Sequence, residues 1–410
     1  MRIVPFLILI ALILAIDAYS FQALRTLVSD WSVRSRRWAA VAFWAVTAYM
    51  FVATALTALI GVGNVPRGLM VYTSATFFIL YLAKVIVIGV LFGEDLVRGA
   101  TWGVRRLTGG SGHLPERRKV VSALAVAVAG VPFAALVHGM VRNAYRYQFH
   151  DVRVPIRDLP SAFEGFRIVQ LSDIHAGSFT QTEPVAEAVD RINALDADLI
   201  VFTGDLVNEL ASEMDDFIEV FGRLRARHGV LSITGNHDYG DYHYGRDPSP
   251  AKTANFERFK QVHAEMGWDL LMDEHRTVAR DGARMAVLGV QNWSEKRFGR
   301  RGDLDAAHAD TEDHDLRILL SHDPTHWDAQ VRPNHPDIAL TLSGHTHGAQ
   351  FGVEHEWLRW SPAQFIYDQW AGLYTQGRQH IYVNRGFGFL GYPGRVGILP
   401  EVAVLELVGA

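Results

Sequence analysis

The sequence predicts four transmembrane helices followed by a layered α/β domain with mixed sheets. Three observations lead to this fold class: four long apolar segments precede residue 142, strand-like and helix-like segments alternate after residue 160, and strand-like segments predominate toward the C-terminus. Such an alternation is typical of layered α/β domains. We therefore expect a transmembrane region at residues 1–141, a linker at 142–159 and a globular domain at 160–410.

Composition also indicates two regions of different character. Hydrophobic residues make up 49% of the 410 residues, which is high for a soluble protein. Residues 1–146 contain 15 of the 39 Lys and Arg but only 5 of the 44 Asp and Glu, so the remainder is acidic. An acidic globular part argues against a nucleic-acid polymer as partner. The chain has no cysteine, which excludes disulfides, thiolate metal sites and a cysteine nucleophile.

The N-terminal region contains four apolar segments, each close to the ~20 residues that a helix needs to cross a bilayer. They are residues 4–24, 38–63, 69–93 and 120–141. The first segment follows a single arginine, Arg2, lacks a clear small-residue cleavage site and precedes three more spans. We therefore expect it to be a retained anchor rather than a cleaved signal peptide.

Basic residues in the loops predict the orientation of these spans. The first and third loops are rich in them: Arg25, Arg34, Arg36, Arg37, Arg98, Arg105, Arg106, Arg117, Arg118 and Lys119. The second loop holds only Arg67. The positive-inside rule then places both termini, and the globular domain, outside the cytoplasm. Four arginines after the fourth span favour the cytoplasmic alternative, which stays open: Arg142, Arg146, Arg153 and Arg157.

Two charged residues lie within the apolar segments, Asp17 in the first and Lys84 in the third. Both fall at a similar depth if the two helices run parallel, and an unpaired charge in a membrane is costly. We expect them to form an ion pair. The alternative is that Asp17 reaches the interface and that Lys84 lines a wet seam.

The globular domain shows strand-like and helix-like patterns in alternation. Strands are expected at residues 166–171, 199–203, 230–234, 285–291, 316–320, 338–342, 381–384 and 396–407. Helices are expected at residues 183–195, 214–224 and 251–266.

Five of these strands end in short loops that carry metal-ligand side chains. They are Asp173, His175, Asp205, Asn236, His322, His345 and His347. An isolated His-x-His pair is as often two surface histidines, but loops at the carboxyl ends of strands in an open α/β sheet converge on one crevice. The mixture of imidazole, carboxylate and amide oxygen suits Mn, Fe or Zn. Seven ligands are too many for one tetrahedral ion and suit two ions that share a carboxylate.

The order of these motifs resembles the calcineurin-like metallophosphoesterase family. The motifs are Asp-x-His at 173–175, Gly-Asp at 204–205, Gly-Asn-His-Asp at 235–238, a lone His322 and Gly-His-x-His-Gly at 344–348. Residues 383–388 and Pro400-Glu401 resemble the membrane-associated bacterial branch, which implies a bacterial plasma (inner) membrane. The resemblance covers about residues 160–408 and implies an α-β-β-α sandwich.

The resemblance also implies an activity and a role for each motif residue. Asp173, His175 and His347 would hold one metal, Asn236, His322 and His345 the second, and Asp205 would bridge them. A metal-bridging hydroxide would hydrolyse a phosphomonoester, phosphodiester or pyrophosphate, with a lipid or envelope component as a candidate substrate.

Three further residues are candidates for the reaction. His237 is the candidate acid that protonates the leaving oxygen, against the alternative of a capping or solvent histidine. Asp238 is expected to orient its imidazole, as a carboxylate often does for a catalytic histidine. Arg385 is either a phosphate-binding arginine or a surface residue.

The sequence leaves three alternatives open. The chain is instead a membrane sensor or binding module if its phosphatase domain is inactive. Aromatic residues between the last metal motif and the closing strands form either an apolar lip for a lipid substrate or part of the core: Trp357, Trp360, Phe365, Tyr367 and Trp370. The acidic run at 303–315 is either a solvated loop or a third metal site.

Overall fold

The computed structural model describes residues 3–60, 65–108, 115–355 and 357–410. It divides into two compact units, Met1–His138 and Gly139–Ala410. The first unit is helical. The second contains the strands, so each unit is described by itself.

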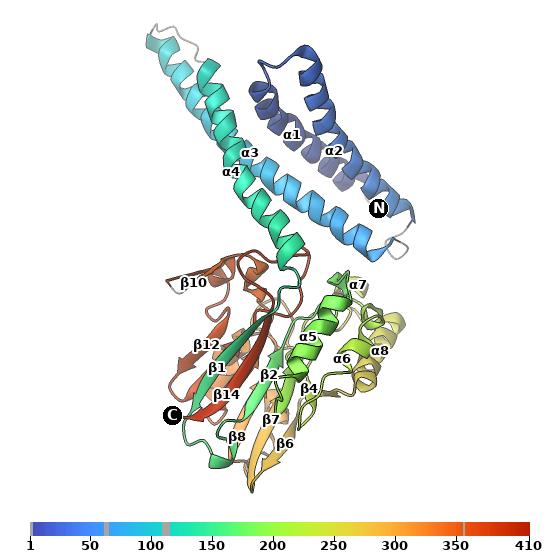
Figure 1. Ribbon diagram of the computed structural model, residues 1–410, viewed down its shortest axis with the longest axis vertical. Coiled ribbons are helices and arrows are strands. Elements are labelled where there is room, and N and C mark those ends of the chain that lie inside the picture. Colours follow the sequence, from blue (N-terminus) through green and yellow to red (C-terminus); the bar gives the residue numbers. More distant parts are fainter. Residues whose placement is uncertain (1–2, 61–64, 109–114, 356) are drawn as a thin grey trace. The chain divides into compact units, whose positions relative to one another are not determined.

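Within the described residues, the first unit contains four long helices (Figure 1): α1 Ile3–Leu27, α2 Val33–Ile60, α3 Arg67–Thr108 and α4 Pro115–His138. Four segments are long and apolar enough to cross a membrane, namely Leu7–Leu27, Val33–Thr57, Arg67–Thr108 and Arg117–Asn143. The four predicted spans are therefore found as helices, except that positions 61–63 of the second lie outside the described residues.

Helix α3 continues well beyond the predicted end of the third span at residue 93. The extension begins with Glu94 and Asp95, both of which receive hydrogen bonds from Arg118 of α4, at 2.7 and 2.6 Å. Tyr19 of α1 also donates to Asp95, at 2.5 Å. Because partners on neighbouring helices satisfy these charges, the helix does not have to end where the apolar sequence ends.

The predicted ion pair between Asp17 and Lys84 is confirmed. Asp17 is fully buried, and its second carboxylate oxygen accepts hydrogen bonds from Thr47 at 2.8 Å and from Tyr81 at 2.9 Å. Asp17 therefore does not reach the membrane interface. Its charge is matched inside the bundle by groups from α2 and α3.

In the described part of the second unit, the strands form two six-stranded sheets and a separate hairpin. The first sheet has the order β1 Gln148–Ile156, β14 Glu401–Gly409, β2 Arg167–Leu171, β3 Leu199–Phe202, β4 Val230–Ser232 and β5 Asp269–Leu270. The second has the order β12 Gly372–Gln376, β13 Gln379–Val383, β9 Leu340–Ser343, β8 Leu316–Leu320, β7 Ala283–Gly289 and β6 Glu274–Arg280. The hairpin consists of β10 Val353–His355 and β11 Leu358–Trp360.

Alternating side chains of the strands supply three apolar layers, as expected from the two-residue period of a strand. Ile168 packs between the two sheets, whereas the adjacent Val169 packs on the outer face of the first. That outer face is covered by α5 Glu183–Asn193, α6 Ile218–Phe221 and α8 Pro250–Met266, which lie together on one flank (Figure 1). α9 Leu304–His308 packs on the outer face of the second sheet. The predicted α-β-β-α sandwich with mixed sheets is confirmed.

The structure differs from the predicted boundaries in the stretch 142–159. Strand β1 lies inside this predicted linker and pairs in parallel with β14. Its inward residues Val154 and Ile156 are buried, while charged residues occupy the exposed face. Those charges gave the segment its polar appearance. The compact units instead divide between His138 and Gly139.

Strands β2, β3 and β4 run parallel in the first sheet, as do β8 and β9 in the second. The two sheets are joined at the carboxyl ends of these strands. There, the Gln170 amide donates to the carbonyl of Ser343 at 2.9 Å, and the Asn384 amide donates to the carbonyl of Gln170 at 3.2 Å. This edge carries the candidate site.

Candidate metal centre

The loops that leave these strands have an uncommon backbone conformation. Five of the seven predicted ligands have a positive φ: Asp173 at 52°, His175 at 49°, Asp205 at 60°, His345 at 72° and His347 at 50°. Non-glycine residues rarely adopt this conformation, which costs about 1–3 kcal/mol each and occurs most often at functional sites.

Two motif glycines allow the loops to approach one another closely. A Cβ atom on Gly235 would lie 2.2 Å from Asp205 Oδ1, and one on Gly344 would lie 2.3 Å from Asp173 Oδ2. No larger residue fits at either position without moving a predicted ligand. This packing explains why glycine precedes Asn236 and His345.

The first cluster of candidate ligands consists of Asp173, His175 and His347, whose ligand atoms lie within 4.8 Å of one another. The Nε2 atoms of His175 and His347 are 3.1 Å apart, and His347 Nε2 is 3.3 Å from Asp173 Oδ1. Two imidazoles bound to one ion, with bonds of about 2.0–2.1 Å, place their nitrogens at a similar separation. The cluster therefore has the spacing of a metal site.

The second cluster consists of Asp205, His322 and His345. His322 Nε2 lies 3.1 Å from Asp205 Oδ2 and 3.2 Å from His345 Nδ1. The Nδ1 atom of His322 is held by the carbonyl of Thr203 at 2.7 Å, which leaves Nε2 as the free ligand atom. Asp205 Oδ2 is also 3.6 Å from His175 Nε2, so this carboxylate lies between the two clusters.

Asn236 directly follows Gly235, which packs against the candidate ligand Asp205. Its amide nitrogen donates to the hydroxyl of Tyr242 at 3.0 Å, which fixes the orientation of the side chain. The buried Oδ1 atom has no hydrogen-bond partner among the residues that the structure describes. An unsatisfied buried oxygen is costly unless a cation or another ligand meets it. The donor set of carboxylates, imidazoles and an amide oxygen therefore fits divalent metal ions.

The electrostatics of the cluster agree with a site built for positive charge. Burial alone would raise the pKa of Asp173, but His347 and His322 hold it below its usual range. Burial likewise opposes the protonated form of His322, but Asp205 and Asp173 raise its pKa to about 10. The carboxylates of the cluster thus favour positive charge at this position.

The two candidate catalytic residues do not interact as predicted. His237 Nδ1 pairs with the carbonyl of Asn208 at 2.7 Å, and its ring stacks on Tyr242 with centroids 4.3 Å apart. The carboxylate of Asp238 instead accepts hydrogen bonds from backbone amides, at Asp205, Leu206, Val207 and Gly235. Asp238 therefore fixes the loop that carries Asp205 and does not orient His237, because it is fully buried beneath that loop.

Arg385 is buried rather than on the surface, and it pairs with two carboxylates. Its guanidinium donates to Glu401 at 2.6 Å and also pairs with Glu354. The side chain is buried. Burial alone would lower the pKa of this guanidinium, but Glu401 and Glu354 hold it above the usual arginine value. The prediction of a surface residue is wrong, and its phosphate-binding role stays a prediction without a supporting contact.

Three residues near the centre were not predicted from the sequence as part of it. Asn208 holds His237 through its backbone carbonyl. Any residue type supplies this group, so the sequence does not reveal the contact. The hydroxyl of Tyr367 lies 2.9 Å from His345 Nε2. Buried Arg395 donates to the carbonyls of His347 and Arg385, at 3.1 and 2.7 Å, and so joins two loops. Burial lowers the pKa of Arg395 to about 10, which still leaves it protonated at neutral pH.

One residue of the acidic run at 303–315 belongs to a further cluster away from the centre. His308 lies near His335 and Asp337, with ligand atoms within 4.8 Å. Arg317 Nε is 3.1 Å from Asp337 Oδ2, the same oxygen that His308 approaches at 2.8 Å. Since an arginine already balances this carboxylate, the cluster is explained without a metal ion.

Comparison with known proteins identifies two matching family models. Residues 1–144 match the model described as a probable calcineurin-like phosphoesterase transmembrane domain. Residues 166–349 match the calcineurin-like phosphoesterase model, and this range includes all five ligand-bearing loops.

Similar proteins come from bacteria and vertebrates. An uncharacterized metallophosphoesterase of Bacillus subtilis strain 168 is 30% identical over 61% of this chain and 81% of its own length. A transmembrane protein with a metallophosphoesterase domain from Danio rerio is 29% identical over 66% of this chain and 60% of its own length. The transmembrane protein with a metallophosphoesterase domain from Bos taurus is 27% identical over 83% of this chain and 74% of its own length.

Fold, donor set and family models together define a membrane protein with a metal-dependent phosphoesterase domain. The chain belongs to the calcineurin-like metallophosphoesterase family and carries the four-helix transmembrane region found with it.

Proposed function

We propose that this membrane-associated enzyme binds two metal ions and hydrolyses a phosphomonoester, phosphodiester or pyrophosphate. The observation that carries the proposal is the pair of facing imidazoles in each cluster, 3.1 and 3.2 Å apart, with Asp205 between the clusters. One ion would be held by Asp173, His175 and His347. The other would be held by Asn236, His322 and His345, with Asp205 shared.

The ligand chemistry supports Mn, Fe or Zn in both positions, because imidazole and carboxylate donors occur together and thiolates are absent from the sequence. When bound, two such ions polarise the phosphoryl oxygens and lower the pKa of water. The surrounding residues hold the ligands in place. His322 is fixed by Thr203, His345 by Tyr367 and Asn236 by Tyr242.

His237 is the group we propose to protonate the leaving oxygen. With Nδ1 held by the Asn208 carbonyl, Nε2 is available to carry the transferred proton. Stacking on Tyr242 fixes the plane of the ring, and its centroid lies 4.9 Å from that of His175 at the first cluster. General acid catalysis of this kind contributes about 10²–10⁴-fold to a rate.

The proposal is tested by hydrolysis of bis-p-nitrophenyl phosphate and p-nitrophenyl phosphate by the full-length protein in lipid nanodiscs. The protein is stripped of metal and refilled with Mn, Fe or Zn. We expect metal-restored turnover that Asp205→Ala abolishes and that Asp281→Ala, in the exposed turn between β6 and β7, leaves unchanged. Metal binding without turnover of any phosphate ester would instead support an inactive sensor module.

For the location, we propose a bacterial inner membrane with the second unit, Gly139–Ala410, outside the cytoplasm. We call this unit the catalytic unit. The proposal rests on the basic residues concentrated in the first and third loops. The natural absence of cysteine allows a direct test. In intact cells, a membrane-impermeant maleimide should label Asp281→Cys without permeabilisation. Labelling only after permeabilisation would place the catalytic unit in the cytoplasm.

A further inference from the structure

The hairpin β10–β11 and the short helix η8 Pro362–Phe365 carry an exposed apolar surface, which we call the aromatic hairpin surface. Its members are Phe351, Val353, Trp357, Leu358, Trp360, Phe365 and Ile366. Trp357 and Phe365 are each 77% exposed, whereas Tyr367 and Trp370 of the same aromatic stretch are buried. The stretch is therefore divided between core and surface. Within it, Val353 pairs with Trp360 across the hairpin, and the Trp360 ring lies 6.4 Å from that of Phe351. Exposed apolar patches of this kind mark interaction sites.

Specific contacts hold the base of this surface on the catalytic unit. The amide of Gly352 donates to the carbonyl of Val396 at 2.8 Å, and the hydroxyl of Ser361 donates to the carbonyl of Gly348 at 2.7 Å. The guanidinium of Arg359 lies 4.5 Å from the ring centroid of Trp370. These contacts fix the base of the hairpin, so its apolar side chains are held in exposed positions by the fold.

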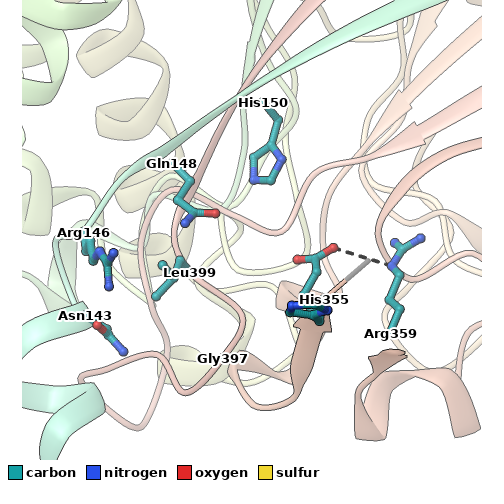
Figure 2. A pocket seen from close by; sticks show the side chains of 9 residues that line it. Asn143, Arg146, Gln148, His150, His355, Arg359, Gly397 and Leu399 are labelled. Atoms are coloured by element: carbon teal, nitrogen blue, oxygen red, sulfur yellow. Dashed lines mark ion pairs between the residues drawn. The ribbon is translucent and has the colours of Figure 1, made fainter. Parts of the chain in front are cut away.

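A polar cavity of about 620 Å³ lies beside the hairpin (Figure 2). Arg146 and Gln148 lie on one side of it, and His355 and Arg359 of the hairpin lie on the other. The volume accommodates a phospholipid headgroup, since small-molecule sites are typically ~300–1,000 Å³.

The lining of this cavity carries a net positive charge. Three guanidinium groups, from Arg146, Arg359 and Arg385, lie in or next to the lining, against the two carboxylates of Glu354 and Glu401. Both carboxylates are paired with Arg385. Glu354 has a second partner in Arg359, whose Nε lies 3.6 Å from Glu354 Oε1. The charge of Arg146 therefore remains to attract an anion, and arginine is well suited to a phosphate group.

The chain itself brings this cavity close to a bilayer. The last segment able to cross a membrane ends at Asn143, which is one of the lining residues. Arg146 follows three residues later, so its Cα lies at most about 11 Å from that of Asn143. The positive pocket is therefore tied by a short length of chain to the end of this span. Exposed tryptophans beside it are of a residue type that favours the membrane interface.

The aromatic hairpin surface also reaches the metal centre. Ile366 at its end is followed directly by Tyr367, whose hydroxyl is 2.9 Å from the predicted ligand His345. A bilayer in contact with this surface would lie beside the rim of the centre. Phosphate esters carried by membrane lipids would then reach the centre more readily than dissolved ones.

We propose that the aromatic hairpin surface docks the catalytic unit on the bilayer, with the phosphate of an anionic phospholipid bound in the cavity beside Arg146 and Arg359. The enzyme therefore acts on phosphate esters of membrane lipids. This last step rests on the proposed phosphoesterase function. The docking itself depends only on the surface and the cavity.

The test uses single-cysteine variants of the full-length protein, which has no cysteine of its own. An environment-sensitive fluorophore is attached at Trp357→Cys or Phe365→Cys, and at Asp281→Cys on the opposite sheet edge as control. Each variant is placed in nanodiscs of phosphatidylcholine with increasing phosphatidylglycerol. We expect a blue shift and protection from aqueous quencher at 357 and 365, increasing with phosphatidylglycerol, and no change at 281. Labels that stay in water at 357 and 365 would overturn the docking.

A charge variant tests the headgroup site. Arg146→Gln in the Trp357→Cys background should raise the phosphatidylglycerol fraction at the midpoint of the shift about fivefold, the effect of one arginine near an anionic surface. Arg157→Gln, an exposed arginine beyond the far end of β1, is the matched control and should leave the midpoint unchanged. Equal midpoints for both variants would overturn the cavity as a headgroup site.

Turnover separates this inference from the proposed function. The Asp281→Cys protein is assayed on soluble bis-p-nitrophenyl phosphate and on phosphatidic acid in the same nanodiscs. Hydrolysis of the soluble ester, together with docked labels and turnover of the lipid ester, supports both. Soluble turnover without docking overturns only the inference, whereas docking without any turnover overturns only the proposed function.

Discussion

The two units of this protein both bury charged groups, but they balance them differently. In the helical unit, Asp17 is matched by Lys84, Thr47 and Tyr81, so each of its carboxylate oxygens has a partner. In the catalytic unit, the candidate ligands crowd together, and Asn236 Oδ1 has no partner among the described residues. A buried polar cluster that satisfies itself is structural. We interpret the cluster of the catalytic unit, with its closely spaced imidazoles and the unpaired Asn236 Oδ1, as arranged for a bound cation.

The largest expected effects are in the metal centre. Two variants there distinguish residues that bind metal from the residue that transfers a proton. Asp205→Ala should lose both metal and turnover. His237→Ala should keep its metal and lose about 10²–10⁴-fold in kcat, with a larger loss for phenyl than for p-nitrophenyl esters because a poor leaving group needs the proton more. Metal content and kcat are measured on the same preparations. An equal loss for both esters would contradict the acid role of His237.

The next effect tests whether the helical cluster is structural. Asp17→Lys places two cations side by side in the bundle and should destabilise it by about 3–5 kcal/mol, the cost of breaking a buried pair. Asp17→Lys combined with Lys84→Asp should recover much of this loss. The measurement is the thermal unfolding midpoint in nanodiscs. A double variant no more stable than the single one would show that Asp17 and Lys84 do not act as a pair.

A smaller effect is expected for residues that orient the candidate ligands. Tyr367→Phe removes the hydroxyl next to His345 Nε2 and should weaken metal binding about 10–100-fold, as is typical for partners of metal ligands. Competition with a chelator measures the affinity. Tyr244→Phe in α7 Asp241–Tyr244 is the control and should bind metal as the natural chain does. Unchanged affinity in Tyr367→Phe would remove this residue from the site.

The smallest effect is a dependence of stability on pH that arises away from the centre. Burial lowers the pKa of His263 to about 4. The unfolded chain takes up this proton below its ordinary pKa of about 6.5 while the folded chain does not, so stability decreases as pH falls from 6.5 to 4. His263 accounts for about 2 kcal/mol of that loss at pH 5. His263→Phe should reduce the pH dependence of the unfolding midpoint, and an unchanged dependence would contradict the assignment.

Much of the fold was predictable because its patterns are local. The strand β8 was predicted at its observed bounds, and all five ligand-bearing loops follow predicted strands. β1 was missed because its exposed face carries charged residues. Only two residues, Val154 and Ile156, are fully buried on its other face, which is too few to give a strand pattern. Edge and hairpin strands such as β10, with all three residues exposed, carry no burial pattern to recognise.

The candidate site was predictable in residue type but not in all its contacts. Asp205 and the histidines stand in motifs, and the structure brings them together. The error at Asp238 has a physical cause. Its sequence neighbour is His237, yet its carboxylate turns inward to backbone amides, and sequence adjacency carries no information about that direction. The burial of Arg385 was not predicted because its partners, Glu354 and Glu401, are distant in the chain.

We infer that two metal ions sharing Asp205 complete the catalytic unit. The most direct test is metal content per chain by inductively coupled plasma mass spectrometry of the full-length protein, after loading with Mn, Fe or Zn and removal of loosely bound ions. We predict two ions per chain in the natural sequence, fewer in Asp205→Ala, and two in Asp281→Ala. One ion or none in the natural sequence under every loading condition would rule out a two-metal centre.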